Sequence, residues 1–250
     1  MSNKIKIFLL VFIVTISCNE EVTSILSTEK FSEEFRGNCK GKDCAKVTID
    51  YCKIVGEKEI AEKINFTVGN SIIFYLKGNS EKNIRAATIS EAANNFLKSY
   101  EKDKKEFPNL SAYLAEIAIT NSYSSPSILS LKTEFYSYTG GAHGNGSIKF
   151  LNFDPLTGNL ISISSIVKDK KKFTEYAEKE FRKENRIPEG TMINSTGFWF
   201  ENDKFYLPES IGISKSEIII IYNSYEIASY ADGPIELRIP IEEAQPYLKF

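Results

Sequence analysis

Two segments in the first half of the chain have apolar residues at spacings of three and four, and this periodicity limits the fold more than any other feature. The apolar positions are Ile60, Ile64, Val68, Ile72 and Tyr75 in the first segment, and Ala93, Phe96, Leu97, Tyr100 and Phe107 in the second. Such spacing gives a helix one apolar face, which must be covered by another layer. We predict helices over residues 58–76 and 90–107, with Ser90 as the N-cap of the second and Pro108 after its end.

Most other segments alternate like β-strands. Predicted strands cover residues 46–53, 112–122, 127–138, 147–153, 160–163, 197–201, 204–207, 217–223 and 235–239. A third helix is predicted over residues 173–185, with Phe173, Tyr176 and Phe181 on its inner face. Runs of strands interrupted by runs of helices are typical of α+β, not of a doubly wound parallel sheet. The predicted fold class is α+β, with antiparallel sheets and about three packed helices in a two-part module.

The length and composition allow two folded parts. The chain has 250 residues, of which 42% are hydrophobic and 26% are charged with both signs mixed, so it can bury a sizeable core. We predict an N-terminal α+β domain over residues 39–140 and a C-terminal α+β domain over residues 141–250. The sequence DPLTGN, residues 154–159, predicts a tight turn in which Gly158 is left-handed.

The first residues have the pattern of a secretory signal sequence. Lys4 and Lys6 precede an apolar run, residues 7–16, that is too short to cross a membrane, which takes about 20 residues. The run ends in TISC, which resembles the lipobox of bacterial lipoproteins, although Leu is more usual there than Thr. The resemblance implies that residues 1–17 are a signal peptide and that Cys18 is lipidated. Cleavage next to Cys18 without lipidation is the alternative.

A polar stretch follows the signal, and we expect residues 18–38 to be a tether. Asn19-Glu20-Glu21 resembles the acidic signal that sends some lipoproteins to the cell surface. The predicted location is therefore the cell envelope, at the outer membrane or the cell surface, with a lipid anchor in the membrane. Without Lys4 and Lys6, acidic residues outnumber basic ones further (33 against 31 in the whole chain), so no nucleic-acid partner is expected.

Apart from Cys18 the chain has three cysteines, and an exported protein is expected to pair two of them. We predict a disulfide between Cys39 and Cys44, which enclose a short glycine-containing loop, with Cys52 buried in a strand as a small apolar residue. No metal site or cofactor is predicted. The chain has no CxxC motif, its lone histidine is far from the cysteines, and it carries no phosphate-binding motif.

The stretch YTGGAHGNGS contains His143, the only histidine, among four glycines. Histidine is the base that a serine or cysteine nucleophile would need, but no G-x-S-x-G elbow supplies a partner. The glycines favour a tight turn in which the imidazole bonds to a neighbouring carbonyl or carboxylate. A ligand contact by His143 or Asn145 and a catalytic role for His143 are the alternatives.

Three stretches together resemble a known pair of domains: YTGGAHGNGS with NFDPLTGNLISISSIV after it, YNSYEIASYADGPIELRIPI, and VTIDYCKIVGEKEIAEKIN. They are similar to the DUF4163-like and DUF3298-like domains of exported bacterial proteins. These domains occur in the ectodomain of lysozyme-sensing anti-sigma factors and, for the first half, beside the catalytic domain of a peptidoglycan deacetylase. Many relatives have Pro at Cys52 and at Ser224 or Ser229. The resemblance implies an envelope module without catalysis of its own.

Two functions from different classes follow. The first is a lipid-anchored binding module for peptidoglycan or a lysozyme-like protein, with Tyr225, Glu226 and Tyr230 as candidate ligand contacts beside His143 and Asn145. Tyr225 as a cap on the core is the structural alternative. The second function is an envelope glycan hydrolase that uses a pair of carboxylates. A cleft with two facing carboxylates would favour the hydrolase, and a shallow aromatic-lined face would favour the binding module.

Overall fold

The computed structural model describes residues 26–37, 44–77 and 86–249. The predictions for the signal peptide, for lipidation of Cys18 and for a disulfide at Cys39 fall outside these residues. Cys52 is a free thiol and is only 4% exposed, as expected for a buried apolar side chain. None of the described helices is long and apolar enough to cross a membrane.

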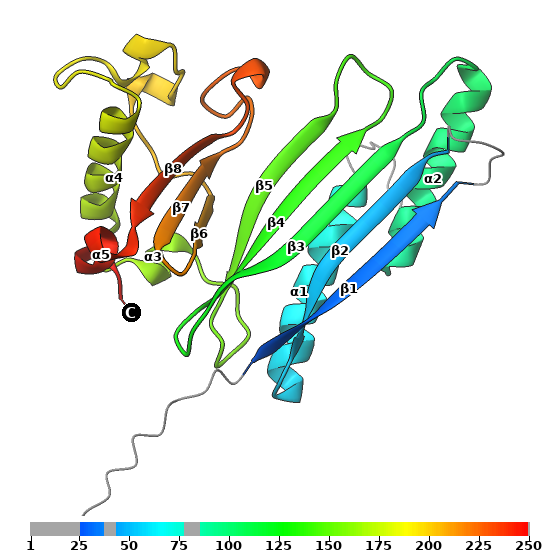
Figure 1. Cartoon of the computed structure of the whole chain (residues 1–250), viewed down its shortest axis with the longest axis horizontal. Helices are drawn as coiled ribbons and strands as arrows, with labels where there is room; N and C mark the ends of the chain where they lie inside the picture. The colour runs from blue at the N-terminus through cyan, green and yellow to red at the C-terminus, as the bar shows by residue number, and fades with distance from the viewer. Residues whose placement is uncertain (1–25, 38–43, 78–85, 250) are drawn as a thin grey trace, which may run out of the picture.

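The first part of the fold is a five-stranded sheet with two helices on one face (Figure 1). Its strands are β1 (Ser27–Arg36), β2 (Lys46–Val55), β3 (Leu114–Ser124), β4 (Leu129–Tyr138) and β5 (Asn145–Phe153), and its helices are α1 (Lys58–Lys77) and α2 (Ile89–Glu106). Neighbours pair in chain order, and only β2 and β3 are parallel. The parallel pair follows from the two helices between these strands, because a parallel connection requires a long crossover.

Both predicted helices of the first part are confirmed. They bury the periodic residues Ile64, Val68 and Ile72 in α1 and Ala93 and Phe96 in α2. The expected N-cap is wrong by two residues. Thr88, not Ser90, is the cap, because its hydroxyl accepts a hydrogen bond from the backbone N–H of Glu91 at 3.1 Å. The side chain of Glu91 completes the cap by accepting from the N–H of Ala87 at 2.7 Å.

The two faces of the sheet differ in character. In β2, Val47 and Ile49 are fully buried on the side of the helices. Thr48 and Asp50 occupy the alternate positions and therefore point to the other side. Strand β3 repeats this alternation, with Ala115 and Ile117 buried. No described helix covers the second face (Figure 1). At β5, Phe150 on this face is buried against Ile219 and Ile221, and the face over the other strands is open.

Residues 27–36 are a correction to the expected tether. They form β1, which pairs antiparallel with β2 along its whole length. The polar composition that suggested a tether belongs to an edge strand, in which Phe31 stacks on Tyr51 and Phe35 packs on the core, while charged side chains face solvent. Charged residues are common on edge strands because they discourage pairing with other chains.

The second part is a three-stranded sheet covered by α4 (Lys170–Glu184), the predicted third helix (Figure 1). Its strands are β6 (Ser210–Ile213), β7 (Glu217–Tyr222) and β8 (Ile235–Pro240), its short helices are α3 (Ile163–Ile166) and α5 (Ile241–Ala244), and its 3₁₀ turns are η1 (Ile193–Thr196), η2 (Glu201–Asp203), η3 (Tyr230–Asp232) and η4 (Gln245–Tyr247). Phe181 of α4 is fully buried among aromatic rings. With the first part, this gives the predicted α+β class.

Three predicted strands are wrong. Residues 160–163 contribute only an isolated bridge at Leu160, although the turn before them is confirmed, with Gly158 at a φ of +67°. Residues 197–201 and 204–207 are irregular, and in the η2 turn between them Asn202 and Asp203 both have a φ of +54°. Their aromatic rings belong to a cluster in the core instead.

Polar side chains join the two parts along the outer edge of β5. The amide of Asn152 donates to the carbonyl of Ile211 at 2.7 Å, and the hydroxyl of Ser210 donates to the carbonyl of Ile148 at 2.8 Å. The junction is also tightly packed, since a Cβ at Gly212 would lie 1.9 Å from the ring of Phe150. The second part therefore has a defined position against the open face of the first sheet.

Candidate functional site

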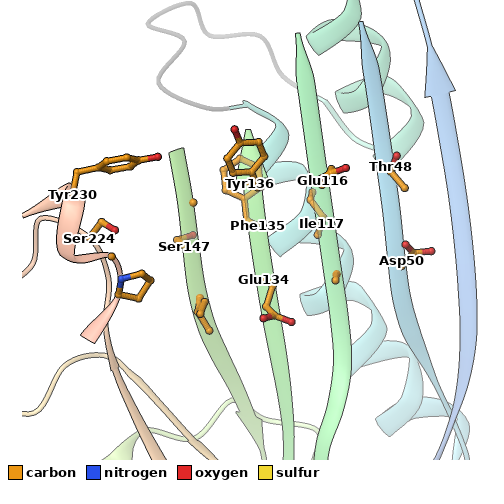
Figure 2. Close-up of a pocket in the computed structure, with 15 residues that line it drawn as sticks. Thr48, Asp50, Glu116, Ile117, Glu134, Phe135, Tyr136, Ser147, Ser224 and Tyr230 are labelled. Carbon is orange, nitrogen blue, oxygen red and sulfur yellow. The ribbon is translucent and has the colours of Figure 1, made fainter. Parts of the chain in front are cut away.

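The open face of the five-stranded sheet carries a groove of about 570 Å³ (Figure 2). Two neighbouring rows of side chains form it: Thr48, Glu116, Tyr136 and Gly146 in one, and Asp50, Ala118, Glu134 and Ile148 in the other. Each row crosses β2, β3, β4 and β5 at paired positions. All eight residues share one face because they occupy alternate positions on their strands.

Loops of the second part form the other wall of the groove. Ser224, Tyr230, Gly233 and Pro234 all border it, and they come from the connection between β7 and β8. The hydroxyl of Tyr230 donates a hydrogen bond to the carbonyl of Gly144 at 2.8 Å, which fixes this wall to the start of β5. The groove therefore exists only where the two parts meet.

Three carboxylates dominate the electrostatics of the groove. Asp50, Glu116 and Glu134 lie on adjacent strands and are exposed to solvent. Glu134 is paired with Lys132 at 2.7 Å between Nζ and Oε1. No Lys or Arg side chain is among the described residues that line the groove. The groove is therefore a region of negative potential.

A stack of aromatic rings forms the rim. The rings of His143 and Tyr230 are stacked with centroids 3.9 Å apart, and the ring of Tyr225 lies 5.8 Å from that of Tyr230. Tyr136 packs directly on the backbone of Gly144, where a Cβ would come within 2.2 Å of the tyrosine oxygen. The glycine-rich stretch and the tyrosine-rich stretch thus lie side by side.

Tyr225 has an unusual backbone and an exposed side chain. Its φ is +69°, a left-handed conformation that is costly for a bulky residue, and its side chain is 59% exposed. The backbone of the turn is held by a hydrogen bond from the N–H of Tyr225 to the carbonyl of Ala228 at 3.1 Å. Strained residues of this kind often occur at functional sites. The interpretation of Tyr225 as a cap on the core is wrong.

Glu226 turns inward and supports this turn. Its Oε2 accepts a hydrogen bond from the backbone N–H of Asn223 at 3.0 Å, and burial raises the pKa of its carboxyl while this hydrogen bond acts in the opposite direction. The side chain of Asn223 in turn bonds to both the N–H and the carbonyl of Ile148, at 2.7 and 3.1 Å. Glu226 thus holds the loop in place and does not line the groove.

The predicted site residues therefore have different positions. His143 is exposed, and its Nδ1 donates to the carbonyl of Gly144 at 2.8 Å, so the expected local hydrogen bond is confirmed. Asn145 is the exposed first residue of β5. Only Tyr230 among the predicted ligand contacts lines the groove, although His143 and Tyr225 adjoin it through their rings.

Sequence reasoning missed the carboxylates and Tyr136. The signal was present, because the strands contain polar residues at alternate positions, such as Thr48 and Asp50 in β2 or Glu134 and Tyr136 in β4. They lie in segments that were predicted as strands, and no function was assigned to them. Within the described residues, no group of three or more His, Cys, Asp or Glu side chains is placed to hold a metal ion.

Two family models match the chain. Residues 38–146 match the model described as deacetylase PdaC, and residues 164–242 match DUF3298, a protein family of unknown function. The chain therefore carries a PdaC-like part followed by a DUF3298-like part, and these two elements of the resemblance are confirmed. The DUF4163 assignment and the anti-sigma-factor context remain predictions. A comparison with curated proteins finds no match.

Solved structures include two similar proteins. One is a DUF3298 family member from Bacteroides fragilis, with a TM-score of 0.72 and 20% identity over 91% of this chain and 95% of that one. The other is a DUF3298 family protein from Pseudomonas aeruginosa, with a TM-score of 0.65 and 18% identity over 90% of this chain and 94% of that one. At these identities the similarity concerns the fold, and it agrees with the α+β class.

Proposed function

We propose that the chain is an exported, lipid-anchored binding module of the cell envelope that holds peptidoglycan or a lysozyme-like protein without catalysis. One observation carries the proposal: an open groove with carboxylates on its floor and an aromatic rim, at the junction of the two parts. Concave sites that combine apolar walls with a few convergent polar groups are typical of ligand binding.

The envelope location rests on the start of the sequence and on the two family matches. Lys4 and Lys6, the short apolar run and Cys18 are the pattern of an exported lipoprotein. The first matched family is named for a deacetylase, which accords with a role near acetylated envelope polymers. Mass spectrometry of the mature amino terminus tests the anchor, since an unlipidated terminus beyond Cys18 contradicts it. Non-reducing peptide mapping tests the predicted Cys39–Cys44 disulfide.

Binding without turnover fits the chemistry of the groove. The Nδ1 of His143 bonds to the backbone carbonyl of Gly144, and its ring stacks on Tyr230. This is not the arrangement in which a histidine takes the proton of a serine or cysteine nucleophile. A general acid for glycan hydrolysis needs a carboxyl held out of water, whereas Asp50, Glu116 and Glu134 are all exposed. The groove thus offers recognition groups, and the surroundings of His143 and of the three carboxylates favour binding over catalysis.

The hydrolase remains the second candidate because of one geometric feature. Glu116 lies diagonally across from both Asp50 and Glu134 in the strand register. In an antiparallel pair such as β3 and β4, diagonal positions are about 7–8 Å apart along the backbone. Flexible side chains at that spacing can bring two carboxyl groups to the roughly 6.5–9.5 Å that separates those of inverting glycosidases. A turnover assay must therefore accompany any binding assay.

The deciding experiment uses residues 19–250, which include every residue that the structure describes. The protein is incubated with purified peptidoglycan and separately with lysozyme, and both retention and soluble products are measured. Saturable retention without products is the expected result. Steady release of sugar fragments that Glu116→Gln abolishes would establish the hydrolase instead, and retention of neither material would contradict the proposed function.

A further inference from the structure

We propose that the groove selects ligands with free amino groups, and that its ligand class is a glycan with unacetylated, positively charged hexosamine units. This inference rests on the proposed binding function and specifies its ligand. Charge, size and the chemistry of the walls support it separately.

The charge of the groove favours a cation. Asp50, Glu116 and Glu134 approach from three adjacent strands, and only Glu134 has a basic partner, Lys132, among the described residues. A protonated amine on this face, among the three carboxylates, would gain charge-assisted hydrogen bonds. A ligand with carboxylate groups would be repelled at the same place. The site therefore discriminates by sign of charge.

The size of the groove favours a few sugar rings. Its volume of about 570 Å³ lies within the range of roughly 300–1,000 Å³ that is typical of small-molecule sites. A protein partner would instead need an interface of about 800 Å² on each side. We therefore place a short stretch of polymer in the groove and treat a protein partner as an outcome of the test.

The walls offer the contacts that a sugar requires. Tyr230 extends from the second part toward β5, with Tyr136 on the neighbouring strand beyond it (Figure 2). His143 covers one face of the Tyr230 ring, so Tyr230 offers the groove mainly its ring edge. Tyr136 is 39% exposed, and a ring of this kind packs against the apolar face of a sugar and attracts cations. Ala118 and Gly146, the small residues of the two rows, leave room between the larger side chains.

The test compares two oligosaccharides that differ only in acetylation. A glucosamine tetramer and an N-acetylglucosamine tetramer are titrated into residues 19–250 by calorimetry, at a mildly acidic pH at which the amines are protonated. We expect the unacetylated tetramer to bind at least tenfold more tightly, as a charge-assisted hydrogen bond would give. Added salt should weaken this binding and leave that of the acetylated tetramer nearly unchanged.

Matched variants locate the effect. Glu116→Gln and Asp50→Asn remove charge at nearly constant size, and each should reduce the preference for the amine several-fold. Glu62→Gln is the control, because Glu62 is an exposed residue of α1 on the opposite side of the sheet. A reduced preference in all three variants would contradict the proposed site.

The outcomes separate this inference from the function on which it rests. Equal binding of the two tetramers would overturn amine selectivity while supporting a glycan-binding module. Binding of neither tetramer, together with retention of lysozyme, would overturn the glycan and indicate a protein partner. If neither tetramer, peptidoglycan nor lysozyme is bound, both proposals are wrong.

Discussion

The two sheets of this protein use their faces differently. In the C-terminal sheet, β6 is buried at all four positions and β7 at every position after Glu217, so both faces are packed. In the N-terminal sheet, β2 and β3 alternate between buried and exposed residues, because helices cover only one face. The packed sheet contributes stability and a fixed wall, whereas the half-covered sheet leaves a surface for binding.

The comparison shows that the groove depends on both sheets. Its floor comes from the open face of the first sheet, and its far wall comes from the loop between β7 and β8. The contacts of Asn152, Ser210 and Asn223 with the other part join the two sheets along β5. We therefore expect substitutions in the second core to affect stability and substitutions on the rim to affect binding.

The largest predicted effect is in the packed C-terminal core. Phe181 is fully buried against Phe198, Phe200, Phe205 and Tyr222. Phe181→Ala should lower the free energy of unfolding by about 3–5 kcal/mol, because it removes apolar burial and leaves a cavity. The control is Phe66→Ala, because the side chain of Phe66 on α1 is 70% exposed. This variant should change the free energy of unfolding by less than about 0.5 kcal/mol. Denaturant titrations measure both variants. Equal losses of unfolding free energy would contradict the expected difference between the buried core and the exposed face of α1.

The second largest effect on the free energy of unfolding is expected at the junction between the two sheets. Gly212→Ala places a methyl group against the ring of Phe150 and should lower the unfolding free energy by about 1–3 kcal/mol. Gly69→Ala has the opposite expected sign, a gain of about 0.5–1 kcal/mol, since Gly69 is in a helix and a Cβ there would contact nothing within 4 Å. Thermal unfolding of both variants measures this. Equal stability of Gly212→Ala and the wild type would show that the junction is loose.

On the rim, Tyr225→Ala should separate affinity from stability. Because Tyr225 is exposed at the edge of the groove, its removal should weaken ligand binding by about 1–3 kcal/mol. The unfolding free energy should not fall, since loss of the ring leaves no cavity. Titration calorimetry measures the ligand affinity of the variant, and a melting curve measures its stability. Loss of stability with unchanged affinity would assign Tyr225 to the fold.

The smallest predicted effect is that of His143→Ala. Loss of the stack on Tyr230 and of the hydrogen bond to Gly144 should lower the unfolding free energy by about 0.5–1.5 kcal/mol. Ligand affinity should stay within a few-fold, because the Tyr230 hydroxyl still holds the wall through its own bond to Gly144. Complete loss of binding in a fully stable variant would instead indicate a direct contact or chemistry at His143.

Periodic segments were predicted well because their pattern is local. The faces of α1, α2 and α4 follow from apolar residues a few positions apart, and β7 follows from an unbroken run of isoleucines. The secondary-structure predictions were wrong where contacts between residues far apart in the sequence decide the local structure. Residues 27–36 are a strand because β2 pairs with them, and residues 197–207 are irregular because their rings meet in the core around Phe181.

The sequence by itself determined the α+β class, the helices, most strands and the turn character of the stretch around His143. Only the tertiary structure decided that Asp50, Glu116 and Glu134 share one face and that Tyr230 closes it from more than ninety positions away in the chain. The physical reason is that the period of a strand specifies which residues point outward. Strand pairing and the docking of the second core decide which outward residues become neighbours.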